Sequence, residues 1–113
     1  MASFEDVRSM SLALPEAEEI LTWESDITFR VGKKIFAMGG EGADHASIKA
    51  SIPAQAELLD LDPETFSKAA YVGRFGWVNV NLARVDREVL EGLLREAWQS
   101  VAPAKLRSQV PPR

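Results

Sequence analysis

The feature that most constrains the fold is a predicted β-hairpin over residues 27–38. Two alternating runs, residues 27–31 and 34–38, flank the pair Gly32-Lys33. A glycine at the first central position of a two-residue loop is typical of a type II′ turn. The predicted cross-strand pairs are Val31 with Lys34, Phe29 with Phe36, and Ile27 with Met38. These six residues should share one face, and the other face should carry Thr28, Arg30, Ile35 and Ala37.

Composition indicates one ordinary globular domain. The chain has 113 residues, of which 46% are hydrophobic and 27% charged, and it contains no cysteine. The missing cysteines exclude a disulfide scaffold, a thiolate zinc site and a cysteine nucleophile. The first residues lack the pattern of a signal peptide, and no apolar run approaches the roughly 20 residues that span a bilayer. We therefore expect a soluble, cytoplasmic protein without membrane contact.

The charges are distributed unevenly along the chain. The net charge is −4, whereas nucleic-acid-binding domains are usually basic. Residues 1–26 hold seven acids against Arg8 alone, but residues 27–56 hold four bases to two acids, and residues 71–113 hold seven bases to four acids. Two interpretations stay open, a cationic patch near the hairpin or scattered, solvated charges.

Local patterns predict three helices. The first begins at the N-cap Ser3 and ends before Pro15, and the second runs from Pro53 to about Leu61 and buries Ala56, Leu58 and Leu59. The third begins after Asp86 and shows the clearest periodicity of the chain. Its predicted apolar stripe consists of Val89, Leu90, Leu93, Leu94, Ala97, Trp98 and Val101.

Further strands are predicted at residues 20–24, 45–50 and 77–82, with a glycine-rich connection at 39–44, a turn at 62–66 and a loop at 73–76. In the strand 77–82, Val78, Val80 and Leu82 should point inward and Trp77, Asn79 and Asn81 outward. Hairpins joined by short loops indicate a two-layer α+β domain, an antiparallel β-sheet with helices packed on one face. We assign this domain to residues 1–101 and expect a loosely ordered tail at 102–113.

Six segments lie in a characteristic order along the chain: Leu14-Pro15, residues 28–37, Ile48-Lys49, residues 62–66, residues 71–78 and the last helix. Together they resemble the MmcQ/YjbR family of small bacterial proteins over roughly residues 7–101. The resemblance implies a compact domain with an antiparallel sheet, described as a double-wing arrangement and commonly labelled DNA-binding. It places Lys33 or Lys34 at the family's hairpin lysine, Lys49 at its strand lysine and Trp77 at its Gly-Trp-Val tryptophan.

The first functional hypothesis is weak, sequence-independent DNA binding through phosphate contacts. Such contacts need long cationic side chains, and a hairpin tip can enter a groove or straddle a backbone. No helix carries base-reading Arg, Asn or Gln at helical spacing. The candidate nucleic-acid-binding residues are Arg30, Lys33, Lys34, Lys49, Arg74 and Arg84. A solubilising turn with scattered lysines is the structural alternative.

The second hypothesis is a protein- or small-ligand-binding adaptor. The sheet face away from the helices should display Arg30, Lys49 and Ser47 beside Trp77, Asn79 and Asn81, with Trp77 and Asn79 as ligand-binding residues. Packing is the alternative role of Trp77. His45 follows Asp44, but one histidine in a glycine-rich loop supports neither catalysis nor a metal site. We expect no enzyme activity, no catalytic residues and no cofactor.

Overall fold

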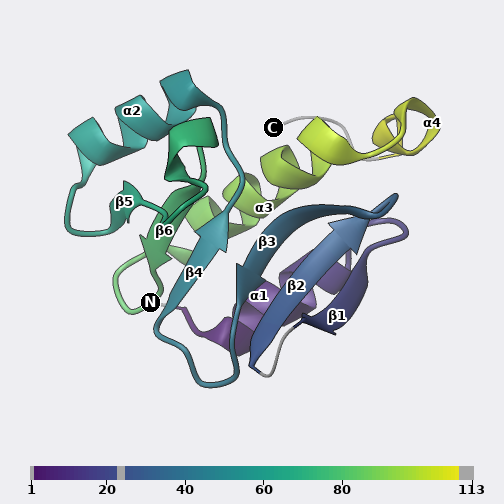
Figure 1. Cartoon of the computed structure of the whole chain (residues 1–113), viewed down its shortest axis with the longest axis horizontal. Helices are drawn as coiled ribbons and strands as arrows, with labels where there is room; N and C mark the ends of the chain where they lie inside the picture. Colours follow the sequence, from purple (N-terminus) through teal and green to yellow (C-terminus); the bar gives the residue numbers. More distant parts are fainter. Residues whose placement is uncertain (1, 23–24, 110–113) are drawn as a thin grey trace.

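The computed structural model describes residues 2–22 and 25–109, which form a six-stranded sheet with helices on one face (Figure 1). The strand order is β1-β2-β3-β4-β6-β5, and all neighbours are antiparallel. The predicted two-layer α+β class is thus confirmed. The elements are α1 (Phe4–Leu12), β1 (Glu18–Thr22), β2 (Asp26–Val31), β3 (Lys34–Gly39), β4 (His45–Ile48), α2 (Ile52–Leu61), β5 (Phe66–Lys68), the 3-10 turn η1 (Gly73–Phe75), β6 (Val78–Asn81), α3 (Arg87–Val101) and α4 (Ala104–Arg107).

Helices α1 and α3 pack together behind the sheet, while α2 lies beside β5 (Figure 1). The core between the two layers contains Phe29, Phe36, Val80 and Leu94, and also Trp98, whose side chain is fully buried. The indole Nε1 of Trp98 donates a hydrogen bond to the carbonyl of Pro15 at 3.0 Å. The stripe predicted on the last helix is therefore confirmed in its centre. Among residues 2–22 and 25–109, no helix combines the length and apolar character that crossing a membrane requires.

The hairpin is confirmed, but its turn type and register differ from the prediction. Gly32 and Lys33 both have positive φ, +57° and +71°, so the turn is type I′ rather than type II′. Val31 pairs with Lys34 and Arg30 with Ile35, but Phe29 pairs with Ala37. Phe36 is the extra residue of a β-bulge, so the predicted pairs Phe29–Phe36 and Ile27–Met38 are wrong. The bulge allows Phe36 and Ala37 both to be buried.

Helix α2 packs differently from its prediction. Ser51 is its N-cap and accepts a hydrogen bond from the Ala54 amide at 3.1 Å. The predicted burial of Ala56 is wrong, because α2 lies at the β5 edge of the sheet, and its buried residue is Gln55. The Gln55 amide donates to the carbonyls of Gly73 and Trp77 at 2.7 and 2.8 Å. These two bonds join α2 to η1 and to the start of β6.

At the two ends of the described chain, the observed helices and strands agree only in part with those that the sequence predicts. Ser3 and Asp6 form a capping box at the start of α1, as the predicted N-cap requires. Strand β1 begins at Glu18, earlier than predicted, and the predicted strand residues Trp23 and Glu24 lie outside the described residues. The segment expected to be a loose tail contains the one-turn helix α4, and Leu106 packs against the core. The boundary at residue 101 stays a prediction, and residues 110–113 lie outside the described part.

Two further differences concern short elements and helix faces. Residues 66–68 form strand β5, whereas the sequence predicts a turn over residues 62–66 and assigns no element to residues 67–68. Three residues are too few for a recognisable alternation. Val89 is exposed, although it was placed in the apolar stripe of the last helix. Successive helical residues are turned by about 100°, so Val89 lies to one side of the fully buried Leu90, where it lines a hollow with Leu93 and Glu96.

Candidate functional site

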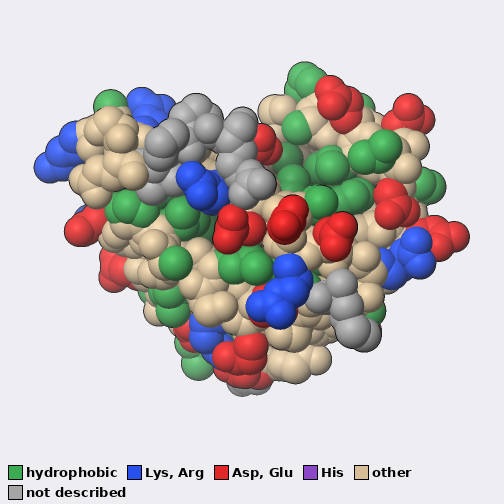
Figure 2. Space-filling view, turned by 180° about the vertical axis from the view of Figure 1, so that it is seen from behind, with side chains coloured by type: hydrophobic (Ala, Val, Ile, Leu, Met, Phe, Trp, Pro, Cys, Tyr) green, Lys and Arg blue, Asp and Glu red, His purple; other side chains and the backbone are tan. Residues whose placement is uncertain are grey.

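Four cations from two distant segments gather at one corner of the molecule. Lys33 and Lys34 are exposed at the tip of the β2–β3 hairpin. The ring of Pro103 lies 3.5 Å from the point that a Cβ on Gly32 would occupy, so α4 begins against this tip. Helix α4 adds Lys105 and Arg107. We call Lys33, Lys34, Lys105 and Arg107 the basic tip, and Figure 2 shows basic side chains gathered at this corner.

The basic tip is not neutralised by neighbouring acids. Within residues 2–22 and 25–109, none of its four cations forms an ion pair. All four side chains belong to exposed residues. Cations in this state keep their full charge available to an anion arriving from solvent.

Arg30 lies on the same hairpin and is held in place by hydroxyl groups. Its Nε donates to Thr28 Oγ1 at 3.0 Å and its Nη2 to Thr22 Oγ1 at 3.1 Å. Thr28 is fully buried and in turn donates to the carbonyl of Ile20 at 3.1 Å. In the described part of the chain Arg30 has no carboxylate partner. The guanidinium is thus oriented on the open face of the sheet while keeping its charge.

The other predicted cations do not join this group. Arg84 forms ion pairs with Glu64 at 3.3 Å and Asp62 at 3.9 Å. Arg74 lies over the ring of Phe75 in η1, with 4.8 Å to its centroid. Lys49 was predicted on the open face beside Arg30, and this prediction is wrong. The strand β4 ends at Ile48, and Lys49 lines a groove between α2 and α3.

Trp77 is buried, with 8% of its surface exposed, so the prediction that it points outward is wrong. Gln55 of α2 donates hydrogen bonds to the main-chain carbonyls of Gly73 and Trp77, so α2 lies next to η1 and the start of β6. Asn79 does lie in a cross-strand row on the open face with Met38, Ser47 and Ser67, of which only Met38 is apolar, and its Nδ2 donates to Ser67 Oγ at 3.2 Å. The open face therefore offers amide and hydroxyl groups, but no stacking surface from Trp77.

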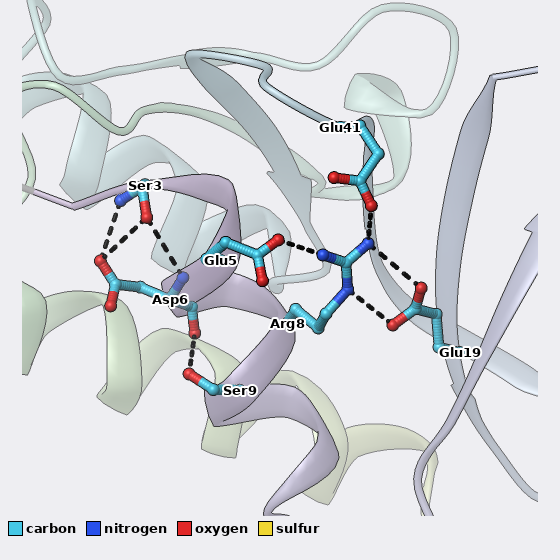
Figure 3. Close-up of polar contacts among 7 residues, drawn as sticks. All are labelled: Ser3, Glu5, Asp6, Arg8, Ser9, Glu19 and Glu41. Carbon is cyan, nitrogen blue, oxygen red and sulfur yellow. Dashed lines mark hydrogen bonds and ion pairs between the residues drawn. The ribbon is translucent and has the colours of Figure 1, made fainter.

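Arg8, in the acidic N-terminal third of the chain, is held by three carboxylates (Figure 3). Its guanidinium contacts the carboxylates of Glu5 and Glu41 and lies 2.9 Å from an oxygen of Glu19. The hydrogen bonds to Glu41 and Glu19 raise the pKa of Arg8 above its usual range. The cluster ties α1 to β1 and to the glycine-rich connection. Arg8 is thus a structural cation, unlike those of the basic tip.

His45 and Asp44 form an exposed pair at the edge of the open face. His45 Nδ1 lies 2.9 Å from Asp44 Oδ1, and this hydrogen bond, together with the charge of His45, lowers the pKa of Asp44. His45, Ser47 and Asn79 also line a hollow of about 770 Å³. Within the described ranges no three His, Cys, Asp or Glu side chains are grouped as a metal site would require.

Sequence reasoning missed Lys105 and Arg107, because the last segment was expected to be loose. The surplus of bases over acids in residues 71–113 was the available signal. That surplus says nothing about position, which depends on the contact between Pro103 and Gly32.

Comparisons with known proteins find one matching family model and one similar fold. The family model described as YjbR matches residues 12–100. The crystal structure of the Deinococcus radiodurans protein DR2400, which contains a DUF419 domain, is similar with a TM-score of 0.83 and 23% sequence identity, covering 100% of this chain and 91% of that one. None of the curated proteins matches the chain in sequence. The family match ends before α4, so Lys105 and Arg107 lie outside it.

Proposed function

This chain belongs to the YjbR family, and for it we propose weak, sequence-independent DNA binding through phosphate contacts at the basic tip. The observation that carries the proposal is the convergence of Lys33, Lys34, Lys105 and Arg107 without ion-pair partners among the described residues. Lysine and arginine contacts to phosphates supply essentially all of the affinity in non-specific complexes. Arg30, on the open face of the same hairpin, is a further phosphate ligand in this proposal.

The absence of base readout follows from the charges on the helices. Sequence-specific proteins usually insert a helix or a strand pair that presents donors and acceptors to base edges. Helix α3 is the longest helix described, and its exposed positions include Glu88, Glu91 and Glu96. These carboxylates repel the phosphates on both sides of a groove. We therefore expect contacts from the tip alone and an affinity of about 10⁻⁴–10⁻⁶ M at physiological salt.

The test is an anisotropy titration of labelled duplex and single-stranded DNA at several salt concentrations. Two variants, Lys33→Ala/Lys34→Ala and Lys105→Ala/Arg107→Ala, each remove two charges from the basic tip. Each phosphate contact contributes about 0.9 to the slope of log K against log salt on duplex DNA. Either variant should therefore flatten this slope by up to about two units.

Lys68→Ala/Arg74→Ala is the matched control, because it lowers the net charge equally at the β5 and η1 edge. The control should keep the wild-type slope. No binding by the wild type at low salt would reject DNA binding altogether. If only the control variant flattens the slope of log K against log salt, the protein binds DNA at the β5 edge and not at the basic tip.

An adaptor role on the open sheet face is the second candidate function. The hollow lined by His45, Ser47 and Asn79 supports it, since its amide, imidazole and hydroxyl groups suit a small polar ligand or a peptide. Because Trp77 is buried, it offers this ligand no aromatic stacking surface. With either function we further propose a non-enzymatic, cytoplasmic protein with the double-wing arrangement that the family resemblance implies.

A further inference from the structure

An apolar groove runs between α2 and α3, on a side of the molecule that the proposed DNA contacts do not use. Its volume is about 950 Å³. Leu58 and Leu61 of α2, Phe75 of η1 and Leu93 of α3 form much of its floor. Figure 2 shows hydrophobic side chains gathered here between acidic ones. A second hollow of about 300 Å³ shares Leu93 and Glu96 and includes Val89, so the groove continues along α3.

Helix α2 leaves an unusual amount of apolar surface uncovered. It contains Ile52, Leu58, Leu59 and Leu61, yet its one buried residue is the polar Gln55. Leu61 is 80% exposed, and Phe75 beside it is 58% exposed. Contiguous exposed apolar surface with a polar rim is typical of a protein-binding site. Leu61 and Phe75 line the groove, so an occupant there would bury them.

The acidic side chains at the rim of the groove indicate that its occupant is positively charged. Glu57 and Asp60 of α2 face Glu96 of α3 across the floor, and Glu88 continues the acidic rim along α3. Lys49 is the cation among the lining residues. An anionic lipid surface or a nucleic acid would be repelled by this rim, whereas a cationic segment would be attracted.

We propose that this groove binds a basic amphipathic helix of a partner protein. Two helices with an apolar floor between them form the surface into which a third helix packs its side-chain ridge. Helix α2 has ten residues, which at 1.5 Å per residue gives about 15 Å of contact, or roughly three turns. The partner helix places leucine-like side chains at i, i+3, i+4 and i+7 on Leu61, Phe75 and Leu93, and its flanking lysines or arginines meet Glu57, Asp60 and Glu96.

The probe is a synthetic fluorescein-labelled peptide of about four helical turns, with leucines at the spacing above and lysines elsewhere. One control peptide has the same composition with its leucines dispersed around the helix. Another keeps the leucines and replaces lysine by glutamate. Anisotropy titration should give binding of the first peptide at least about tenfold tighter than of either control, because one tenfold step needs only 1.4 kcal/mol.

Protein variants locate the binding surface. Leu61→Gln/Phe75→Gln changes two exposed floor residues and should weaken peptide binding at least about tenfold. Leu12→Gln/Leu21→Gln changes two exposed residues of α1 and β1 and is the matched control; it should keep the wild-type affinity within about twofold, since surface changes outside an interface have small effects. Circular dichroism melting curves establish that each variant is folded. The floor variant should leave DNA binding unchanged, so that failure here is separate from failure of the proposed function.

Three results would overturn the proposal. Equal peptide binding by the wild type and the floor variant would place the peptide elsewhere. Equal binding of the amphipathic and dispersed peptides would mean that charge alone attracts them. Concentration-dependent dimerisation in sedimentation runs, abolished by Leu61→Gln, would make the groove an interface between copies of this chain. If the proposal is right, a benzophenone-labelled version of the probe peptide should crosslink to residues of α2, η1 and α3.

Discussion

Replacing Gln55 tests how α2 is attached to η1 and to the start of β6, and the groove beside α2 depends on that attachment. Gln55 is 4% exposed and donates both amide hydrogens to main-chain carbonyls. Methionine has a similar length but no donor, so Gln55→Met removes two hydrogen bonds without opening a large cavity. Each neutral hydrogen bond contributes about 0.5–1.5 kcal/mol net.

The carbonyls that Gln55 binds keep a second donor, which limits the cost of the substitution. The Gly73 carbonyl also accepts from the Gly76 amide at 3.0 Å, and the Trp77 carbonyl from the Ala69 amide at 3.3 Å. Neither becomes an orphaned buried acceptor. We therefore expect Gln55→Met to lower the free energy of unfolding by about 1–2 kcal/mol. In a domain of about this size, each kcal/mol of that loss lowers Tm by roughly 4–8 °C.

Gln55→Glu should be more damaging and should depend on pH. An ionised carboxylate would face two carbonyl oxygens in a buried site, so burial and repulsion raise its pKa above the unfolded value of about 4.3. The folded variant then binds more protons than the unfolded chain. Its stability is greatest below about pH 4.3 and falls as the pH rises through the folded pKa. The gap to the wild type should thus widen from pH 4 to pH 7.

Urea unfolding followed by circular dichroism at both pH values measures these effects, with m-values checked for constancy. Gln109→Met, at an exposed position, is the control and should change stability by less than about 0.5 kcal/mol. A loss below about 0.5 kcal/mol for Gln55→Met, smaller than one hydrogen bond, would refute the attachment argument. A pH-independent gap for Gln55→Glu would show that the side chain escapes to solvent.

Three other substitutions test the core, a tight turn and a titrating group. Trp98→Ala should cost about 3–5 kcal/mol in urea unfolding, as for large aromatic truncations in cores; a cost below about 1 kcal/mol would contradict the packing of α3. Gly76→Ala should cost clearly more than Gly42→Ala in thermal melts, although both have positive φ, because its Cβ would lie 2.4 Å from the Ala50 carbonyl oxygen whereas Gly42 has open space around it; equal losses would exclude the clash. The Thr65 hydroxyl donates to Asp62 at 2.6 Å and, with Arg84, lowers the Asp62 pKa. The stability that this provides is present above the unfolded pKa of about 3.9 and is lost as the pH falls through the folded pKa. The deficit of Thr65→Val in urea unfolding should therefore shrink in acid, and a constant deficit would assign the effect to packing.

The amino-acid sequence by itself determined the elements whose signals are local. Ser3 with Asp6 defines the start of α1, the spacing of Leu90, Leu94 and Trp98 defines the buried side of α3, and the alternation of Val78 and Val80 defines the inner face of β6. Each signal lies within one or two turns or a few strand residues. The periodicity of a helix or a strand therefore indicates which of its faces packs on the core, without knowledge of the elements that pack against it.

Only the tertiary structure decided features that need two distant segments. The bulge at Phe36 depends on fitting Phe36 and Ala37 into one core, and the place of α2 depends on the bonds from Gln55 to the carbonyls of Gly73 and Trp77. Lys49 leaves the strand face because the chain turns toward α2 after Ile48. Lys105 and Arg107 join Lys33 and Lys34 because Pro103 packs on Gly32. Periodicity orients a residue within its own element, but only packing between elements determines its neighbours and whether another element covers it.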